Sequence, residues 1–577
     1  MADITAPEYI SPYVVTTSGG LVLDRDVYTM PVGAASILQN FEPSVKGGYR
    51  RLSGTTKYSS SQVGGSSNTI LGVAIFNNGV VAAQSTNVYF GTGSTWSSID
   101  SGRTSAGRYR FEKYNFSTNE ERLIFADGAN AASVYNGTTV MDIKGATTIS
   151  TTGSASSSST SLSVASAAGI MEGMYIGGTN IGSGAKVSSI SGTTVTMSVA
   201  TTGTISSGSV TFAGLGTAPS DPSMVVAFKN HMFYAGMSTE PNTVIFSAIG
   251  DENDFTTANG AGSLNVDSTI VALKSFRGEL IIFCEDRIYK LAGASRSDFA
   301  IAPISRNVGC SDAFSIQEIG GDVIFLAPDG LRTIAGTARI GDVELGTVSK
   351  QIQDRIGDIG FNNISSVVIR DKSQYRLFYP TTGGTESSSK GIIGVLKSNP
   401  SGQVGWEYSD IRGMKPACCD SGFVSGVEKV IHGGFDGYVY LQESGNTFSG
   451  TAMKAIYRSP DLTMGDAGIR KSMQRINVNY DPEGAVDVNL FVKYDFEDTG
   501  TPQPSSYNLT TADTAAVYGD SGTLYGSAVY DAEGMPIVRQ SVEGSGFTVV
   551  VRLEDSSSNP PITLKGFELE FTPGARM

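Results

Sequence analysis

The chain has 577 residues and a formal net charge of −14. This length exceeds what one hydrophobic core usually serves and predicts about three or four folding units. The negative charge argues against a protein that grips nucleic acid, because such binding depends on Lys and Arg neutralising phosphates. Seventy glycines and only 17% charged residues, with frequent Val, Ile, Tyr and Phe, predict a mainly β protein. We expect no membrane segment, because no run approaches ~18 apolar residues, and no export signal at Met1–Thr5.

The first informative stretch runs from Met30 to Thr55. Pro31 suits the first turn of a helix, because its missing N–H would have no intrahelical partner there. A short helix is therefore expected from Pro31 through Leu38. The pair Gly47-Gly48 then predicts a tight turn that presents the next three residues, Tyr49-Arg50-Arg51, side by side.

This stretch resembles the N-terminal signature of the tail nozzle proteins of short-tailed bacteriophages (podoviruses), also called tail tubular protein B. The matching residues are Pro31, Gly33-Ala34-Ala35, Asn40-Phe41, Pro43 and Gly47-Gly48-Tyr49-Arg50-Arg51. The resemblance implies a structural virion protein, a hexameric ring that ends the tail tube below a ring of adaptor or tubular proteins. It also implies tail fibres at its sides, genomic DNA passing along its axis without tight binding, and assembly into the virion tail in the host cytoplasm.

From Ile70 to Ser444 one pattern recurs, an apolar strand, a tight turn and a second strand rich in Val and aromatics. Asp127-Gly128, Asp329-Gly330 and Asp436-Gly437 follow apolar runs, and Asp-Gly between such runs is a hairpin signal. Recurrence at intervals of roughly 30 to 50 residues indicates the blades of an irregular β-propeller. An array of β-sandwiches is the alternative.

The stretch 146–220 interrupts this pattern, because Glu172 and Lys186 are its only charged residues. Apolar and polar residues largely alternate in 161–164 and 186–197, which favours a small inserted β-module over a flexible linker.

Two further elements follow. Val348, Ile352, Ile356 and Ile359 fall on one face of a helix over 347–359, which we expect to pack against the blades. After Gly450, long alternating strands predict an antiparallel β-sandwich with one wet face. The expected divisions are 1–69, a docking segment with a short helix; 70–145 and 221–450, blades; 146–220, the module; and 451–577, the sandwich.

Residues that carry chemistry are sparse. The chain has only His231 and His432, its four cysteines show no CxxC spacing, and no GxxxxGK[ST] loop is present. We expect buried reduced thiols, structural histidines, no metal, no cofactor and no enzymatic activity. Asp251, Glu252 and Asp254, or Asp322 and Asp329, are the carboxylates considered for glycosidase chemistry, but acidic residues in turns mostly bind local backbone N–H groups.

The densest basic cluster is Lys46 with Arg50 and Arg51, on the turn Gly47-Gly48-Tyr49; Arg470 and Lys471 form a second. Arg makes bidentate pairs with carboxylates, so these residues are candidate docking contacts for a neighbouring tail protein; a solvated loop is the alternative. The acidic balance suits a channel wall that repels DNA, but it also suits simple solubility. Alternative functions are a receptor-binding tail fibre or adhesin and a glycan-degrading depolymerase.

Overall fold

The structure, a computed structural model, divides into two compact units. It describes residues 10–26, 29–104, 107–116, 121–143, 148–213, 215–335, 347–360, 363–381, 389–398, 404–500, 502–511 and 537–576. Unit 2 is Val63–Ala313, and unit 1 holds the described residues before and after it. Met1–Thr5, from which we expect no export signal, lies outside the described residues. No helix of the described part is long and apolar enough to cross a membrane.

Unit 2 contains four meanders, each a sheet of four consecutive antiparallel strands. Their strands are β6 (Ile70–Phe76), β7 (Gly79–Gln84), β8 (Asn87–Gly91) and β9 (Trp96–Asp100); β10 (Arg110–Tyr114), β11 (Arg122–Ala126), β12 (Ser133–Tyr135) and β13 (Val140–Asp142); β20 (Met224–Phe228), β21 (His231–Ala235), β22 (Thr243–Phe246) and β23 (Gly262–Asn265); β24 (Ile270–Phe276), β25 (Glu279–Cys284), β26 (Ile288–Ala292) and β27 (Ala300–Ser305). Small antiparallel meanders in chain order are what propeller blades consist of, so the propeller-like expectation is confirmed.

The inserted module is also confirmed as a folded unit. It is a six-stranded sheet in the order β16-β19-β14-β15-β18-β17 with its own hydrophobic core. Its strands are β14 (Ile149–Ala155), β15 (Ser161–Val164), β16 (Tyr175–Gly178), β17 (Val187–Ser191), β18 (Thr194–Met197) and β19 (Ile205–Ala213). Its first and last strands are paired neighbours, with Ile149 opposite Phe212. Both ends of the module therefore lie together.

Unit 1 continues with three more blade-like groups. They are β28 (Gln317–Ile319), β29 (Asp322–Ala327) and β30 (Gly330–Thr333); β31 (Ser365–Ile369), β32 (Gln374–Tyr379), β33 (Lys390–Ser398) and β34 (Val404–Arg412); and β35 (Pro416–Val424), β36 (Val427–Gly434) and β37 (Val439–Gln442) with β5 (Thr55–Lys57). In the last group the early strand β5 pairs with β37, so residues before the first meander complete the final sheet.

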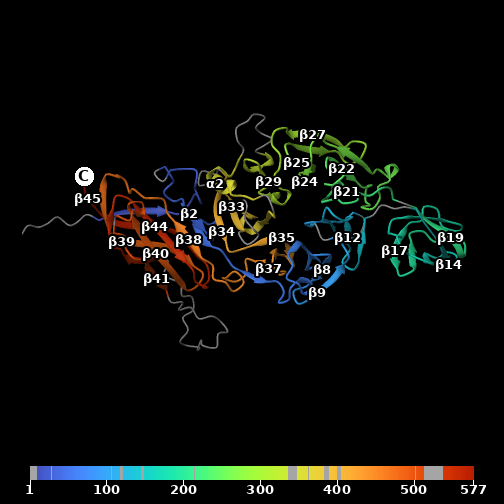
Figure 1. Ribbon diagram of the computed structural model, residues 1–577, viewed down its shortest axis with the longest axis horizontal. Coiled ribbons are helices and arrows are strands. Elements are labelled where there is room, and N and C mark those ends of the chain that lie inside the picture. Colours follow the sequence, from blue (N-terminus) through green and yellow to red (C-terminus); the bar gives the residue numbers. More distant parts are fainter. Residues whose placement is uncertain are drawn as a thin grey trace, which may run out of the picture. The chain divides into compact units, whose positions relative to one another are not determined.

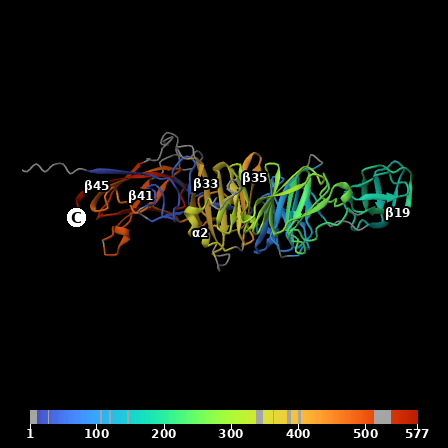
Figure 2. The same cartoon turned by 90° about the horizontal axis from the view of Figure 1, so that it is seen from above.

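The C-terminal β-sandwich is confirmed, and N-terminal strands complete it. One sheet holds β1 (Ser11–Thr16), β3 (Phe41–Pro43), β4 (Tyr49–Arg51), β39 (Ile469–Pro482), β42 (Ile537–Ser541), β43 (Ser545–Gly546) and β45 (Ile562–Arg576). The other extends β31–β34 through β2 (Ile37–Gln39), β38 (Ala455–Arg458), β44 (Val549–Asp555), β40 (Val486–Tyr494) and β41 (Tyr507–Thr511). Figures 1 and 2 show β41 and β45 in this sandwich.

The core of the sandwich is formed by strands in which buried residues alternate with exposed or half-buried ones. Along β40 every second residue, from Val486 to Tyr494, is buried, and the intervening residues are exposed or half-buried. Buried residues of β39, β40, β44 and β45 join one cluster with those of the blade strands β32–β34. The predicted helix of 347–359 is shorter than expected, a 3₁₀ turn at Lys350–Ile352 and α2 (Gln353–Gly357), and its apolar face packs into this cluster.

The helix predicted from Pro31 is wrong. Residues 31–36 form turns, and β2 follows. The backbone N–H of Ala35 donates to the carbonyl of Gly20 (2.9 Å), and that of Val22 donates to the carbonyl of Ala35 (3.0 Å). Tertiary pairing with residues 20–22 therefore replaces the local hydrogen bonds that a helix needs.

The hairpins are confirmed in position, and two of the three connections contain the expected Asp-Gly pair. The loop between β29 and β30 is Pro328-Asp329, with Gly330 already paired to Ala327. The loop between β11 and β12 spans residues 127–132. Asp436-Gly437 lies within the turn between β36 and β37, where Gly437 has φ +81°, and Asp127-Gly128 opens the loop between β11 and β12, where Gly128 has φ +74°.

Excision of the module tests its independence. Because its ends are neighbours, replacing Thr148–Ala213 by a short Gly-Ser linker costs little loop-closure free energy. We expect a soluble protein in which the fluorescence of Trp96 on β9 reports an unchanged urea midpoint for unit 2. Insoluble expression, or loss of that transition, would show that the meanders need the module.

Candidate functional site

The residues of the N-terminal signature lie in one place in unit 1. There β2 belongs to the nine-stranded sheet that contains β34 and β38, and β3 and β4 belong to the seven-stranded sheet that contains β39 and β45. We call these three strands, with the turns that flank them (residues 31–53), the joint. β2 pairs in parallel with β34 (Gln39 opposite Asp410) and antiparallel with β38 (Leu38 opposite Tyr457). β3 and β4 form a hairpin whose second strand pairs with β45, Tyr49 lying opposite Leu564. A segment of fifteen residues, Ile37–Arg51, thus contributes to both sheets.

Small residues of the signature permit close approach. A side chain on Gly33 would meet the carbonyl oxygen of Thr16 at 2.1 Å, and Ala34 and Ala35 are fully buried. Gly48 has φ +85°, and a side chain there would meet the carbonyl of Leu564 at 2.4 Å. Glycine is required at both positions because no side chain has room.

Asn40 turns the chain from the nine-stranded sheet into the seven-stranded one. Its backbone has φ +53°, a left-handed conformation that Asn tolerates better than most residues. Its side-chain amide donates to the carbonyls of Arg412 (3.0 Å) and Lys454 (2.8 Å) and accepts from the N–H of Arg412 (2.8 Å). The signature asparagine therefore secures the corner to two other chain segments.

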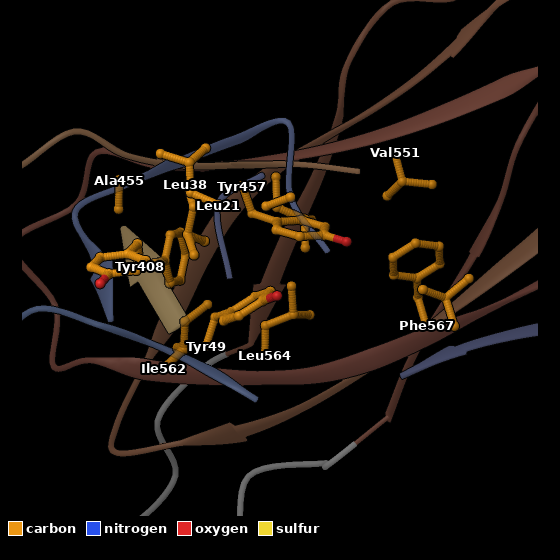
Figure 3. Close-up of a cluster of buried hydrophobic side chains, with 14 of the residues drawn as sticks. Leu21, Leu38, Tyr49, Tyr408, Ala455, Tyr457, Val551, Ile562, Leu564 and Phe567 are labelled. Carbon is orange, nitrogen blue, oxygen red and sulfur yellow. The ribbon is translucent and has the colours of Figure 1, made fainter. Parts of the chain in front are cut away.

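Tyr49 is a core residue, contrary to the expectation that the turn presents it. Figure 3 shows its ring among Leu564, Ile562 and Tyr457, and the ring centroids of Tyr49 and Tyr457 are 5.7 Å apart. Its hydroxyl accepts from the N–H of Gly20 and donates to the carbonyl of Gly33, both at 3.0 Å. Burial raises the pKa of this phenol well above its usual value.

Arg51 is also buried, because alternation along β4 turns Tyr49 and Arg51 inward and Arg50 outward. Its guanidinium forms an ion pair with Asp555 (3.3 Å), and both side chains are almost completely buried (0% and 2% exposed). It also donates to the carbonyls of Ser557 (2.6 Å) and Asn559 (2.8 Å). A charge enclosed in this way is unavailable to a neighbouring protein, so the expectation that the turn presents both guanidinium groups is wrong for Arg51.

Arg50 and Lys46 remain near the surface. Arg50 is half-buried and makes a bidentate pair with the exposed carboxylate of Glu483 (2.5 and 2.8 Å). Lys46 is exposed on the turn, beside Gly47 and Gly48. The turn itself is confirmed, since the N–H of Ser44 donates to the carbonyl of Gly48 (3.0 Å). A docking role for Lys46 and Arg50 stays a prediction.

In the second basic pair, Arg470 and Lys471, one side chain is likewise buried and the other is exposed. Lys471 is 1% exposed, and its ammonium donates to the carbonyls of Asp466 (2.5 Å) and Phe547 (3.1 Å). Burial lowers its pKa. Arg470 is exposed and donates to Ser545. Only Arg470 of this pair is accessible as a contact.

A buried charge network that the sequence did not predict lies behind β3. Glu42, 2% exposed, accepts from Lys372 (2.6 Å), Gln374 (2.9 Å) and Arg376 (3.3 Å). Arg376, fully buried, also pairs with Glu443 (2.5 Å). Burial raises the pKa of Glu443, but Arg376 and Lys372 outweigh burial and hold that pKa well below its usual range. The network connects the joint with β32 and with Glu443, which directly follows β37.

The carboxylates considered for glycosidase chemistry all have hydrogen-bond or ion-pair partners within the protein. Asp251 and Asp254 accept backbone N–H groups two residues ahead (2.9 and 2.8 Å), and Glu252 pairs with an arginine of β11 (2.9 Å). Asp322 and Asp329 form hydrogen bonds within or beside their own hairpin. The interpretation that they bind local backbone N–H groups is confirmed for Asp251, Asp254 and Asp322, whereas Glu252 and Asp329 pair with arginine side chains. Among the described residues, no group of three His, Cys, Asp or Glu could hold a metal ion.

The two histidines differ. His231 is buried, and its Nδ1 donates to the carbonyl of Ser247 (2.6 Å), as expected of a structural histidine. His432 on β36 is 4% exposed and stacks on Tyr440 (ring centroids 5.0 Å apart), but its Nδ1 has no hydrogen-bond partner among the described residues. Burial lowers the pKa of His432 to about 3, although the carboxylate of Asp436 acts in the opposite direction. Of the cysteines, Cys284, Cys310 and Cys418 are buried as expected, and Cys419 is half-buried.

No protein-family model and no curated protein matches the chain. Similar solved structures include Kluyveromyces lactis Hsv2p (8% identity, 60% of this chain and 98% of that chain, TM-score 0.26) and Saccharomyces cerevisiae Sqt1 (10% identity, 67% and 98%, TM-score 0.32). An ancestral GH74 enzyme is another (10% identity, 76% and 52%, TM-score 0.27). At TM-scores this low the likeness carries no argument, so the propeller-like description rests on this chain's own sheets.

The ion pair between Arg51 and Asp555 provides a stability test. Arg51→Met leaves the Asp555 carboxylate buried and unpaired, and we expect it to destabilise unit 1 by about 3–5 kcal/mol. In a Trp96→Phe background the fluorescence of Trp406 on β34 reports urea unfolding of unit 1 alone.

Arg470→Gln on the exposed surface is the matched control, with an expected change within about 0.5 kcal/mol. Equal effects of the two substitutions would contradict the role assigned to Arg51.

The lowered pKa of His432 predicts how the free energy of unfolding of unit 1 depends on pH. Below about pH 6.5 the unfolded chain binds a proton at this residue, whereas the folded chain does not until about pH 3. Stability is therefore lost as pH falls through this range, by about 2 kcal/mol at about pH 5 for this group alone. His432→Phe should flatten the difference in urea midpoint between about pH 7 and 5, read from Trp406. An unchanged slope would mean that His432 titrates normally in the folded protein.

Proposed function

We propose that this chain is a structural protein of a short phage tail, the nozzle that forms part of the conduit for genome ejection and a docking platform for adaptor and fibres. The observation that supports the proposal is the role of the signature residues. Gly33, Asn40, Gly48, Tyr49 and Arg51 are the residues that let one N-terminal segment join the blade strands to the sandwich.

This observation links the sequence resemblance to architecture. A signature that builds a joint between sheets specifies a fold, and a chain with the same signature is expected to share that fold. The described carboxylates and His231 are engaged in turns and packing, which favours a structural role over the depolymerase alternative. The proposed oligomer is a hexameric ring, with the exposed Lys46 and the half-buried Arg50 as contacts toward an adaptor ring.

Imaging tests the proposal against its alternatives. Negative-stain micrographs and mass photometry of the purified chain, alone and mixed with the tail proteins of its own phage, should show hexameric rings with a central hole. Trimers with elongated stalks would favour a receptor-binding fibre instead. Release of reducing sugars from capsular glycans would favour a depolymerase.

Lys46→Glu is the variant to include, because Lys46 is exposed and its reversal leaves the core intact. We expect this variant to fold normally and to co-purify less with the adaptor, since charge reversal turns attraction into repulsion. Lys229→Glu is the matched control, because Lys229 is exposed and belongs to neither basic cluster. Undiminished adaptor binding by Lys46→Glu would remove the basic turn from the interface.

A further inference from the structure

A pocket of about 410 Å³ opens in unit 1 beside the strand pair β37 and β5. Its lining includes Lys415 from the loop between β34 and β35, His432 at the end of β36, Tyr440 on β37, and Phe448 from the following loop. A volume of this size lies in the range of small-molecule sites. None of these residues belongs to the joint.

Aromatic rings form a fixed wall of the pocket. Tyr440 stacks on His432 with an angle of 15° between the ring planes. Its hydroxyl donates to the carboxylate of Asp436 (2.5 Å), which holds the ring in place. Phe435 and Phe448 are half-buried and contribute two further rings. The Tyr440 ring is therefore held in place before any ligand arrives.

Hydrogen-bond donors and hydrogen-bond acceptors accompany these rings. Nδ1 of His432 is buried and unpartnered among the described residues, in an imidazole that stays neutral at physiological pH. Lys415 is exposed and has no ion pair with any described residue, so its ammonium is available as a donor. The Asp436 carboxylate and the hydroxyls of Thr55 and Ser449 supply further acceptors and donors.

We propose that this pocket binds a saccharide ring. A pyranose offers an apolar C–H face, which packs on aromatic rings, and hydroxyl groups that both donate and accept hydrogen bonds. A planar aromatic hydrocarbon would use the rings but gain no hydrogen bond from the ammonium, the imidazole or the hydroxyls beside them. The described lining holds a single carboxylate, Asp436, whereas glycoside hydrolysis by the usual mechanism takes two. The inference is therefore binding without cleavage, and it does not depend on the proposed tail function.

Saturation-transfer NMR on the full chain tests this proposal. The probes are methyl α-D-glucopyranoside, methyl α-D-galactopyranoside, methyl α-D-mannopyranoside and N-acetyl-D-glucosamine, each at millimolar concentration. We expect transfer from protein aromatic protons to the ring C–H protons of at least one sugar. Phe448→Ala and Lys415→Gln should each weaken its Kd by about tenfold, as loss of one ring contact or one charged donor predicts.

Phe423→Ala is the matched control, because Phe423 is 57% exposed on β35 and does not line the pocket. It should leave the Kd unchanged, and the Trp406 unfolding transition verifies that all three variants fold. Absence of transfer to every sugar would overturn the proposal. So would equal Kd values for Phe448→Ala and the parent chain, or binding of indole at this pocket with no sugar bound.

Discussion

The fold of unit 1 depends on a single N-terminal segment that must enter three sheets in succession. Between Ile37 and Lys57 the chain pairs with β34 and β38, then with β45, and finally with β37. Three residues shape this path: Asn40 at the first corner, Gly48 in the hairpin of β3 and β4, and Arg51 where the strand leaves the core. The segment thus belongs both to the sandwich and to the sheets of the blade-like groups in unit 1.

The same segment also takes part in the buried ion pairs of unit 1. Arg51 with Asp555, and Arg376 with Glu42 and Glu443, are buried ion pairs within or beside the joint. Desolvation offsets much of the attraction in such pairs, so they add less stability than their number indicates. Each pair nevertheless requires its two side chains to meet, because a charged side chain left unpaired in the core destabilises the folded state. We interpret them as fixing which strands meet.

Much of the fold could be predicted from local patterns. Period-two alternation identified the sandwich strands, and recurrent hairpins identified the blades, because both signals lie within a few residues. The joint could not be predicted in this way. Ala34, Ala35 and Leu38 fit a helix locally, and only their pairing with Gly20 and with β34 and β38 makes them extended. The burial of Arg51 depends on Asp555, whose position no local pattern reveals. The His432 pocket likewise assembles residues from β5, from β36 and from the loops around them.

The pairing of β1 with β45 has a consequence for biosynthesis. The first described strand finds its partner only when Gly566–Phe571, which lie far later in the chain, have left the ribosome. Within each meander of Val63–Ala313 the paired strands are consecutive in sequence, so each of these sheets can form while translation continues. β1, β4 and β5 must wait for their later partners with hydrogen-bonding edges uncovered. Misassembly during synthesis is therefore most probable at these strands, and a chaperone that shields them would keep their edges free for the later partners.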